Sequence, residues 1–223
     1  MQRVLEEELM VNTAQVHAYA QADFAEPNQA FCDFLFQQFP RLPSACKVID
    51  LGCGPGDIVR RLAAVRPHWH FTAVDGSAAM LEQARSTLGG ATLHGRVDLV
   101  CSRLPDLPPT VDQNYDLILS NSLLHHLADP SVLWSAVRSL GKPGAAVLVG
   151  DLLRPESPEA AHAIVETYSG TEPEVLKRDF FQSLCAAFRR AEIEEQLGSA
   201  GLDCLQFEQV SDRHGYVFGV MPI

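Results

Sequence analysis

The chain has 223 residues and a formal net charge of −11 at pH 7, with 47% hydrophobic and 20% charged residues. Domains usually span ~100–200 residues, so this length and composition indicate one folded domain with a small appendage and exclude wholesale disorder. The acidic balance also argues against a nucleic-acid partner, which needs clustered Lys and Arg, and favours a small or neutral substrate.

The segment ahead of the first strand predicts two helices, at 1–18 and 27–39, because apolar residues such as Phe31, Phe34 and Leu35 recur at helical spacing. Glu6, Glu7 and Glu8 do not fit a signal peptide, and no run of ~20 apolar residues occurs, so we expect a cytoplasmic protein with no membrane partner. The six cysteines form no Cys-x-x-Cys pair, which predicts buried, reduced thiols and no metal site.

From Lys47 onward, strand candidates alternate with amphipathic helices. The first five strands are apolar at consecutive positions, the pattern of parallel strands that are covered on both faces. Two further strands with a short connection predict an antiparallel pair at the end of the chain. The expected fold class is therefore α/β, a Rossmann-like, doubly wound, seven-stranded and mostly parallel sheet with an antiparallel C-terminal strand. The predicted strands are 48–51, 71–75, 97–101, 117–120, 145–150, 203–210 and 215–221.

Capping signals mark where the helices begin. Ser77 precedes the helix 78–88, and Asp129-Pro130 precedes 132–140; Ser157-Pro158 and Thr171-x-x-Glu174 open two consecutive helices, and a last helix covers 191–199. We expect a single domain with four parts: an N-terminal helical cap at 1–40, a core at 46–150, a helical insertion at 155–188, and a last helix with a terminal strand hairpin at 189–223.

The strongest functional signal is a strand that runs into the turn Gly52-Cys53-Gly54-Pro55-Gly56 and then into a helix. In an open parallel sheet, ligands lie beyond the carboxyl ends of the strands, and glycines let the backbone approach them closely. A dinucleotide fingerprint would need glycine where this chain has Asp57, which disfavours pyrophosphate binding. Asp75 follows ~20 residues later at the tip of the second strand, where a carboxylate can accept both ribose hydroxyls of an adenosine.

Together these motifs resemble the class I S-adenosylmethionine-dependent methyltransferases. Residues 50–56 are similar to the family's first motif, Asp75 to its ribose-binding acid, 76–80 to the start of the next helix, 115–121 to the fourth-strand motif, and 140–149 to the turn into the fifth strand. The resemblance implies that the chain binds S-adenosyl-L-methionine and releases S-adenosyl-L-homocysteine. The cofactor-binding residues it implies are Tyr19, Asp50, Gly52, Cys53, Gly54, Gly56, Asp75, Gly76, Ser77, Met80, Ser102, Arg103 and Asn121.

One position departs from the family pattern. Many members carry an acid after the third strand that binds the adenine amino group, whereas this chain has Cys101-Ser102-Arg103. Either Ser102 or the backbone would accept that hydrogen bond. Tyr19, in the cap, either reaches the methionine end of the cofactor or ties the cap to the core.

The candidate catalytic residues are His125, His126 and Asp151. Histidine titrates near neutrality and is the commonest acid or base in enzymes, and His125 is the preferred base because it is nearer to the strand tip. Alternatively, both histidines pack against the cofactor pocket. Asp151 either faces the substrate, pairs with Arg154 or caps local backbone.

These residues lead us to expect methyl transfer by in-line displacement to a small-molecule acceptor. Residues 1–40 and 155–188 would cover the region where the substrate enters and exclude water from it. The alternatives are methylation of a peptide or protein, and a non-catalytic, S-adenosylmethionine-binding regulatory protein, with a nucleotide-dependent oxidoreductase third. The acceptor atom, the pathway and the choice between monomer and homodimer stay open.

Overall fold

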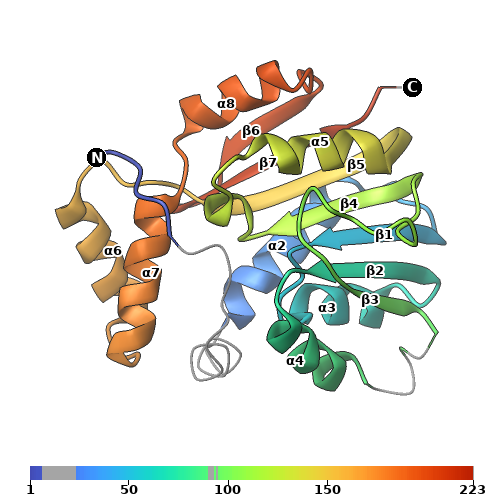
Figure 1. The fold of residues 1–223 in the computed structure, drawn as a ribbon, viewed down its shortest axis with the longest axis horizontal. Coiled ribbons are helices and arrows are strands. Elements are labelled where there is room, and N and C mark those ends of the chain that lie inside the picture. The colour runs from blue at the N-terminus through green and yellow to red at the C-terminus, as the bar shows by residue number, and fades with distance from the viewer. Residues whose placement is uncertain (7–23, 90–92, 94, 223) are drawn as a thin grey trace.

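The computed structural model describes residues 1–6, 24–89, 93 and 95–222. Its centre is a seven-stranded sheet of order β3-β2-β1-β4-β5-β7-β6 (Figure 1). Strands β1 to β6 run parallel and β7 runs antiparallel to both of its neighbours, which confirms the predicted fold class. The strands are β1 (Cys46–Leu51), β2 (Trp69–Asp75), β3 (Val97–Cys101), β4 (Tyr115–Asn121), β5 (Gly141–Leu152), β6 (Leu205–Gln209) and β7 (His214–Val220).

Helices cover the sheet on both faces. Side chains alternate along a strand, so Leu117 and Leu119 of β4 pack on one side while Ile118 packs on the other. All three are fully buried, which explains the uninterrupted apolar run in the sequence. One layer contains α2 (Ala25–Gln38), α3 (Asp57–Val65) and α4 (Ala78–Leu88), and the other contains α5 (Ser131–Leu140) and α8 (Arg190–Ser199) (Figure 1).

Helix α2, which the sequence analysis assigns to a cap, packs in the main core. Phe31 and Leu35 are fully buried, and the rings of Phe31 and Phe34 make edge contacts with Tyr216 of β7 at 5.6 and 4.9 Å. The helical spacing places these three residues on one stripe, which covers the sheet. This helix is therefore part of the layer that supports β1 and β7.

Residues 1–6 are not helical, so this part of the predicted helix 1–18 is wrong. The rest of that helix lies outside the described residues, and so does Tyr19. The Val4 amide donates to the Cys185 carbonyl of α7 (Glu174–Ala186) at 3.1 Å. The Arg3 guanidinium donates to three carbonyls, those of His125 and Leu127 at 2.9 Å and of Ala186 at 2.5 Å. These hydrogen bonds to distant elements fix the segment, which has no hydrogen bonds of its own helix to do so.

Of the four helix-start predictions, those at Ser77 and Ser157 are confirmed and that at Thr171 is wrong. The fourth differs in position: α5 begins at Ser131 with Pro130 as its N-cap, and Asp129 accepts from the Ser131 amide at 2.9 Å. The hydroxyl of Ser77 accepts from the Met80 amide at 3.3 Å, and that of Ser157 accepts from the Ala160 amide at 3.2 Å at the start of α6 (Pro158–Ser169). Thr171 caps nothing: α7 begins only at Glu174, because its N-cap is Pro173, whose carbonyl accepts the first helical bonds. Helices α6 and α7 pair at the end of the sheet (Figure 1).

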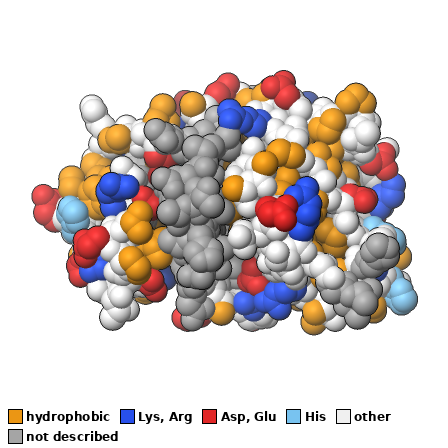
Figure 2. Space-filling model, turned by 60° about the horizontal axis from the view of Figure 1, so that its bottom comes forward, with side chains coloured by type: hydrophobic (Ala, Val, Ile, Leu, Met, Phe, Trp, Pro, Cys, Tyr) orange, Lys and Arg blue, Asp and Glu red, His pale blue; other side chains and the backbone are white. Residues whose placement is uncertain are grey.

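The surface agrees in part with the composition. Helices in the described ranges are all too short or too polar to cross a membrane. On the face drawn in Figure 2, Lys and Arg side chains lie scattered among acidic and apolar ones, without a continuous basic stripe. Cys32, Cys46 and Cys53 are buried free thiols as expected, whereas Cys101 and Cys204 are exposed, because they end β3 and precede β6 at the sheet margin.

Candidate functional site

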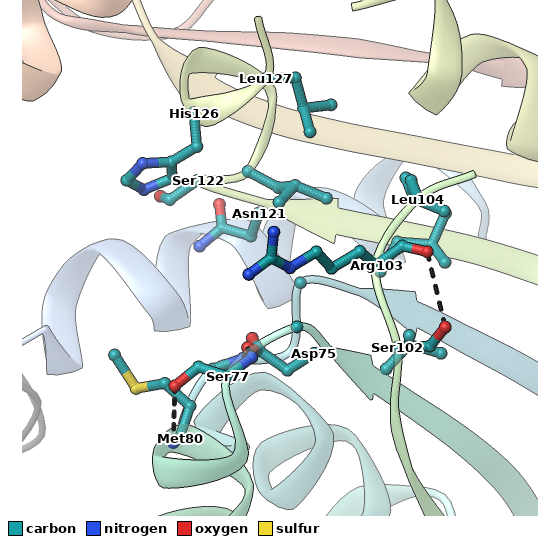
Figure 3. A pocket seen from close by; sticks show the side chains of 16 residues that line it. Asp75, Ser77, Met80, Ser102, Arg103, Leu104, Asn121, Ser122, His126 and Leu127 are labelled. Carbon is teal, nitrogen blue, oxygen red and sulfur yellow. Dashed lines mark hydrogen bonds between the residues drawn. The ribbon is translucent and has the colours of Figure 1, made fainter. Parts of the chain in front are cut away.

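A cavity that is partly open to solvent lies at the carboxyl ends of β1 to β4. The strand order reverses at β1, which is flanked by β2 and β4, and such switch points are where open α/β sheets bind ligands. Among the predicted cofactor-binding residues, nine line the cavity (Figure 3): Gly52, Gly54, Asp75, Gly76, Ser77, Met80, Ser102, Arg103 and Asn121.

Gly54 is the part of the turn that borders open space. Its φ of +52° is a conformation that side chains with a Cβ rarely adopt, and a Cβ built there would meet nothing within 4 Å. A Cβ on Gly52 would instead lie 2.9 Å from the Cβ of Leu123, and one on Gly56 would lie 2.9 Å from Leu88. The turn is therefore packed at both ends, and only its middle leaves room for a ligand.

Asp75 joins the turn to the next helix. Its Oδ2 accepts from the Gly54 amide at 2.9 Å and its Oδ1 accepts from the Ser77 amide at 2.7 Å. Burial raises the pKa of this carboxyl group, against the lowering effect of the two amide bonds. A carboxylate has about four acceptor positions, so each oxygen keeps capacity for a ligand hydroxyl on the cavity side.

Asp50 lies beneath the turn and does not line the cavity. It is 1% exposed, and neither of its carboxyl oxygens has a hydrogen-bond partner among the described residues. Burial, together with the nearby Asp75, raises the pKa of Asp50 to about 7. A buried carboxyl group without a partner is costly, so a positively charged donor bound at the turn would be favoured there.

Two more of the predicted cofactor residues face away from the cavity. Cys53 is buried in the core on the α2 side of the sheet, and Gly56 packs against α4. Ser102 turns its hydroxyl to the Asp106 carbonyl at 2.6 Å, whereas the Arg103 side chain extends into the cavity between Asp75 and Asn121 (Figure 3). The structure thus places the turn, the tip of β2 and the ends of β3 and β4 around one space.

The two histidines occupy different environments at the short helix η1 (Leu124–His126). His126 lines the cavity, on the side opposite Met80 (Figure 3). His125, the residue preferred as base from its position in the sequence, is 3% exposed, and its Nδ1 lies 2.5 Å from Oδ1 of Asp151. Asp151 therefore pairs with His125 and accepts from the His125 and Leu152 amides, while Arg154 pairs with Glu192.

Sequence reasoning missed several residues of the site. Apolar side chains that line it, such as Leu104 and Leu127, carry no motif. Ser122 has a φ of +59°, an uncommon value outside glycine, which directs the chain from β4 past the cavity. Glu6 lies 2.9 Å from His126, and its position in a run of acids gave no signal of this contact.

Comparisons with known proteins agree with this geometry. Residues 49–147 match the family model described as a methyltransferase domain. A trans-aconitate 2-methyltransferase of Streptomyces avermitilis is 37% identical over 95 residues, which cover 42% of this chain and 34% of that protein. An uncharacterised methyltransferase of Mycobacterium bovis is 31% identical over 124 residues, which cover 55% and 58%. The chain thus spans between a third and three fifths of the length of these relatives.

A solved structure extends the similarity to most of the fold. The crystal structure of a plantazolicin methyltransferase in complex with a triazolic desmethylPZN analog and SAH superposes with a TM-score of 0.69 at 12% identity, covering 94% of this chain and 91% of the other. The matched region contains the glycine turn, Asp75, β4 and the two histidines, which are the elements that surround the cavity. These findings support the resemblance to the class I S-adenosylmethionine-dependent methyltransferases that the motifs indicate.

Proposed function

We propose that this protein transfers a methyl group from S-adenosylmethionine to a small-molecule acceptor. The observation that carries the proposal is the cavity itself, which joins the open face of Gly54, the carboxylate of Asp75 and the ring of His126 around one space. When bound, the cofactor supplies a methyl group already activated on a positive sulfur. The chain therefore has to bind, align, exclude water and manage a proton.

The residues present fit the cofactor. The space beside Gly54 admits a ligand that a side chain would fill, Asp75 keeps acceptor positions for two ribose hydroxyls, and the partnerless carboxyl group of Asp50 suits the charge of an ammonium group. Met80 and Leu104 supply apolar surface for a flat ring, with Ser102 and Arg103 at its rim. We assign these groups, with Gly52, Gly76, Ser77 and Asn121, to cofactor binding.

On the acceptor side, His126 is the group placed to receive a proton. Burial and the nearby charge of His125 lower the pKa of His126, so the ring is neutral at neutral pH and has a lone pair that can accept a proton. His125 and Asp151 lie behind it and hold the turn in place. Leu123 and Leu127 line the same wall and keep water from it.

Two observations support a small acceptor. Among the relatives, the one from Streptomyces avermitilis is named a trans-aconitate methyltransferase, and trans-aconitate is a small organic acid. The second is that the cavity is recessed and only partly open to solvent, which suits a small molecule better than a folded protein. We also propose that residues 155–188 cover the substrate and that Tyr19 contacts the methionine end of the cofactor.

Replacing Asp75 by Asn should lower the affinity for S-adenosylhomocysteine by at least about tenfold, because the two hydroxyl bonds lose their charged acceptor, and such bonds contribute about 1.5–3 kcal/mol each. Isothermal titration calorimetry measures this change. Asp98→Asn on the exposed side of the neighbouring strand β3 is the matched control and should bind as the wild type does. Equal affinity of the Asp75 and Asp98 variants would remove the ribose assignment.

The function itself is tested in two stages. Calorimetry with S-adenosylhomocysteine and with NAD identifies the cofactor; binding of NAD alone would favour an oxidoreductase. Radiolabelled S-adenosylmethionine is then offered with a panel of small carboxylic acids, phenols and amines, and in parallel with a peptide library. Label in a small-molecule product supports the proposal, label only in peptides contradicts it, and cofactor binding without any transfer indicates a regulatory protein.

A further inference from the structure

Glu6 lies between the two histidines of the site. Its Oε1 is 2.9 Å from Nδ1 of His126 and 3.4 Å from Nε2 of His125. On the far side, Nδ1 of His125 meets Asp151 at 2.5 Å. Four titratable side chains thus form a continuous row, Asp151, His125, Glu6 and His126, that leads from the interior of the protein to the cavity wall.

The carboxylate of Glu6 is held from its own side as well. The Ser183 hydroxyl of α7 lies 3.2 and 3.3 Å from its two oxygens, and the side chain is only 13% exposed. Arg3, three residues earlier, binds the carbonyls of His125 and Leu127 and stacks on the Phe188 ring at 3.7 Å. The segment 1–6 therefore fixes Glu6 against the turn, although it lies outside the region matched to the family model.

Charged and titratable groups around the two histidines come from several elements, including His214 of β7, which interacts with His125 and Asp151, and Arg103 of the cavity wall. Glu6 belongs to the segment 1–6, His125 to η1, Asp151 to β5 and Asp75 to β2, with Arg3 beside His125. Burial opposes the charged form of His125, but Asp151 and Glu6 outweigh it and raise the pKa of His125. For His126, burial and His125 lower the pKa, while Glu6 acts in the opposite direction.

The same row could be considered as a metal site, since Glu6, His125 and His126 offer ligand atoms within 4.8 Å of one another. The two rings, however, stack with centroids 4.1 Å apart and planes only 36° apart. Imidazole binds metal ions in the plane of its ring, so stacked rings direct their lone pairs side by side. The arrangement favours proton handling instead.

We propose that Glu6 is a positioning residue that holds the Nδ1 proton of His126 and so leaves the Nε2 lone pair free for the cavity. The Nδ1 atom lies 2.9 Å from Oε1 of Glu6, and it makes no hydrogen bond of regular geometry to any other described group. This inference rests on the proposed function. It implies an acceptor that loses a proton: the O–H or N–H bond breaks, its electron pair remains on the attacking atom, and the proton bonds to Nε2, where Glu6 balances the new charge.

The test measures the histidine rings directly and needs no acceptor. Long-range ¹H–¹⁵N spectra of the full chain labelled with ¹⁵N-histidine, recorded across a pH titration, report the pKa and the tautomer of each ring, and His126→Gln assigns the His126 signals. In the wild type we expect neutral His126 to carry its proton on Nδ1. In Glu6→Gln, the pKa of His126 should fall and the Nδ1–H share should decrease, because the carboxylate that favoured both is gone.

His125 and a second variant serve as references. The pKa of His125 is set first by Asp151 among its charged neighbours and should move less than that of His126. Glu195→Gln, an equal change of charge at an exposed position of α8, should move neither ring. An unchanged His126 pKa and tautomer in Glu6→Gln, or equal shifts of both rings, would overturn the proposal.

Calorimetry on the same samples separates this inference from the proposed function. Glu6→Gln should bind S-adenosylhomocysteine with wild-type affinity, since Glu6 does not line the cavity. Failure of the wild type to bind would contradict the proposed function, whereas normal binding with an unaltered His126 would contradict only the role of Glu6.

Discussion

Gly54→Val is expected to reduce the affinity for S-adenosylhomocysteine at least about 100-fold while leaving a folded protein. A valine side chain at this position would extend into the open space of the cavity, because a Cβ there meets no protein atom within 4 Å. It would also strain the backbone, since φ is +52° and a β-branched residue in that region costs about 1–3 kcal/mol. Calorimetry measures the affinity and thermal unfolding measures the strain.

The chain offers a close control for the strain. Gly144 is near the start of β5, so it lies at the amino ends of the parallel strands, away from the cavity. It has a φ of +79°, and a Cβ built there would likewise meet no atom within 4 Å. Gly144→Val should lower the melting temperature by a similar amount and leave the affinity for S-adenosylhomocysteine unchanged. If the Gly54 variant folds and binds as tightly as the Gly144 variant, the cofactor does not approach this turn.

Much of the fold could be predicted from the sequence because each element has a local cause. Strand β3 and helix α4 begin and end where the apolar runs and the Ser77 cap indicate, and the other strands differ from prediction only at their ends. The helix predicted at 1–18 is wrong at residues 1–6, because the prediction considered only neighbouring residues in the sequence. What holds those six residues is Arg3, bound to carbonyls from η1 and α7 far along the chain.

In the candidate site, too, features with a local cause could be predicted, and contacts between distant residues could not. The glycine turn and Asp75 can be recognised in the sequence, because the positive φ values and a carboxylate at a strand tip require particular residue types at a fixed spacing. The sequence located the histidine pair but could not tell which ring faces the cavity. The geometry of the short helix η1 places His126 at the cavity, while His125 is buried against Asp151. The role of Glu6 could not be predicted, because its contact with His126 joins residues more than a hundred positions apart in the sequence.

Asp151→Asn is expected to have the largest effect on stability, a loss of about 3–5 kcal/mol, because it removes one partner of a buried ion pair and leaves the other charge uncompensated. Asp151 and His125 are 4% and 3% exposed, and the carboxylate also accepts from the His125 and Leu152 amides. Chemical denaturation at fixed pH measures the loss. In a His125→Gln background the same substitution should cost much less, because no buried charge remains; equal costs in both backgrounds would show that the pair is not coupled.

The pH dependence of that loss follows from the two pKa shifts. The Asp151 carboxylate, paired with His125, has a lowered pKa despite its burial, so its contribution is present above its unfolded pKa of about 3.9 and is lost as the pH falls through the folded value. His125 has a raised pKa, so its contribution is complete below its unfolded pKa of about 6.5 and is lost as the pH rises through the folded value. The difference in free energy of unfolding between wild type and Asp151→Asn should therefore be greatest between about pH 4 and 6.5 and should shrink on both sides. A difference that stays constant from pH 4 to 9 would mean that the His125 ring is neutral in the folded protein and that Asp151 acts only as an acceptor for the two amides.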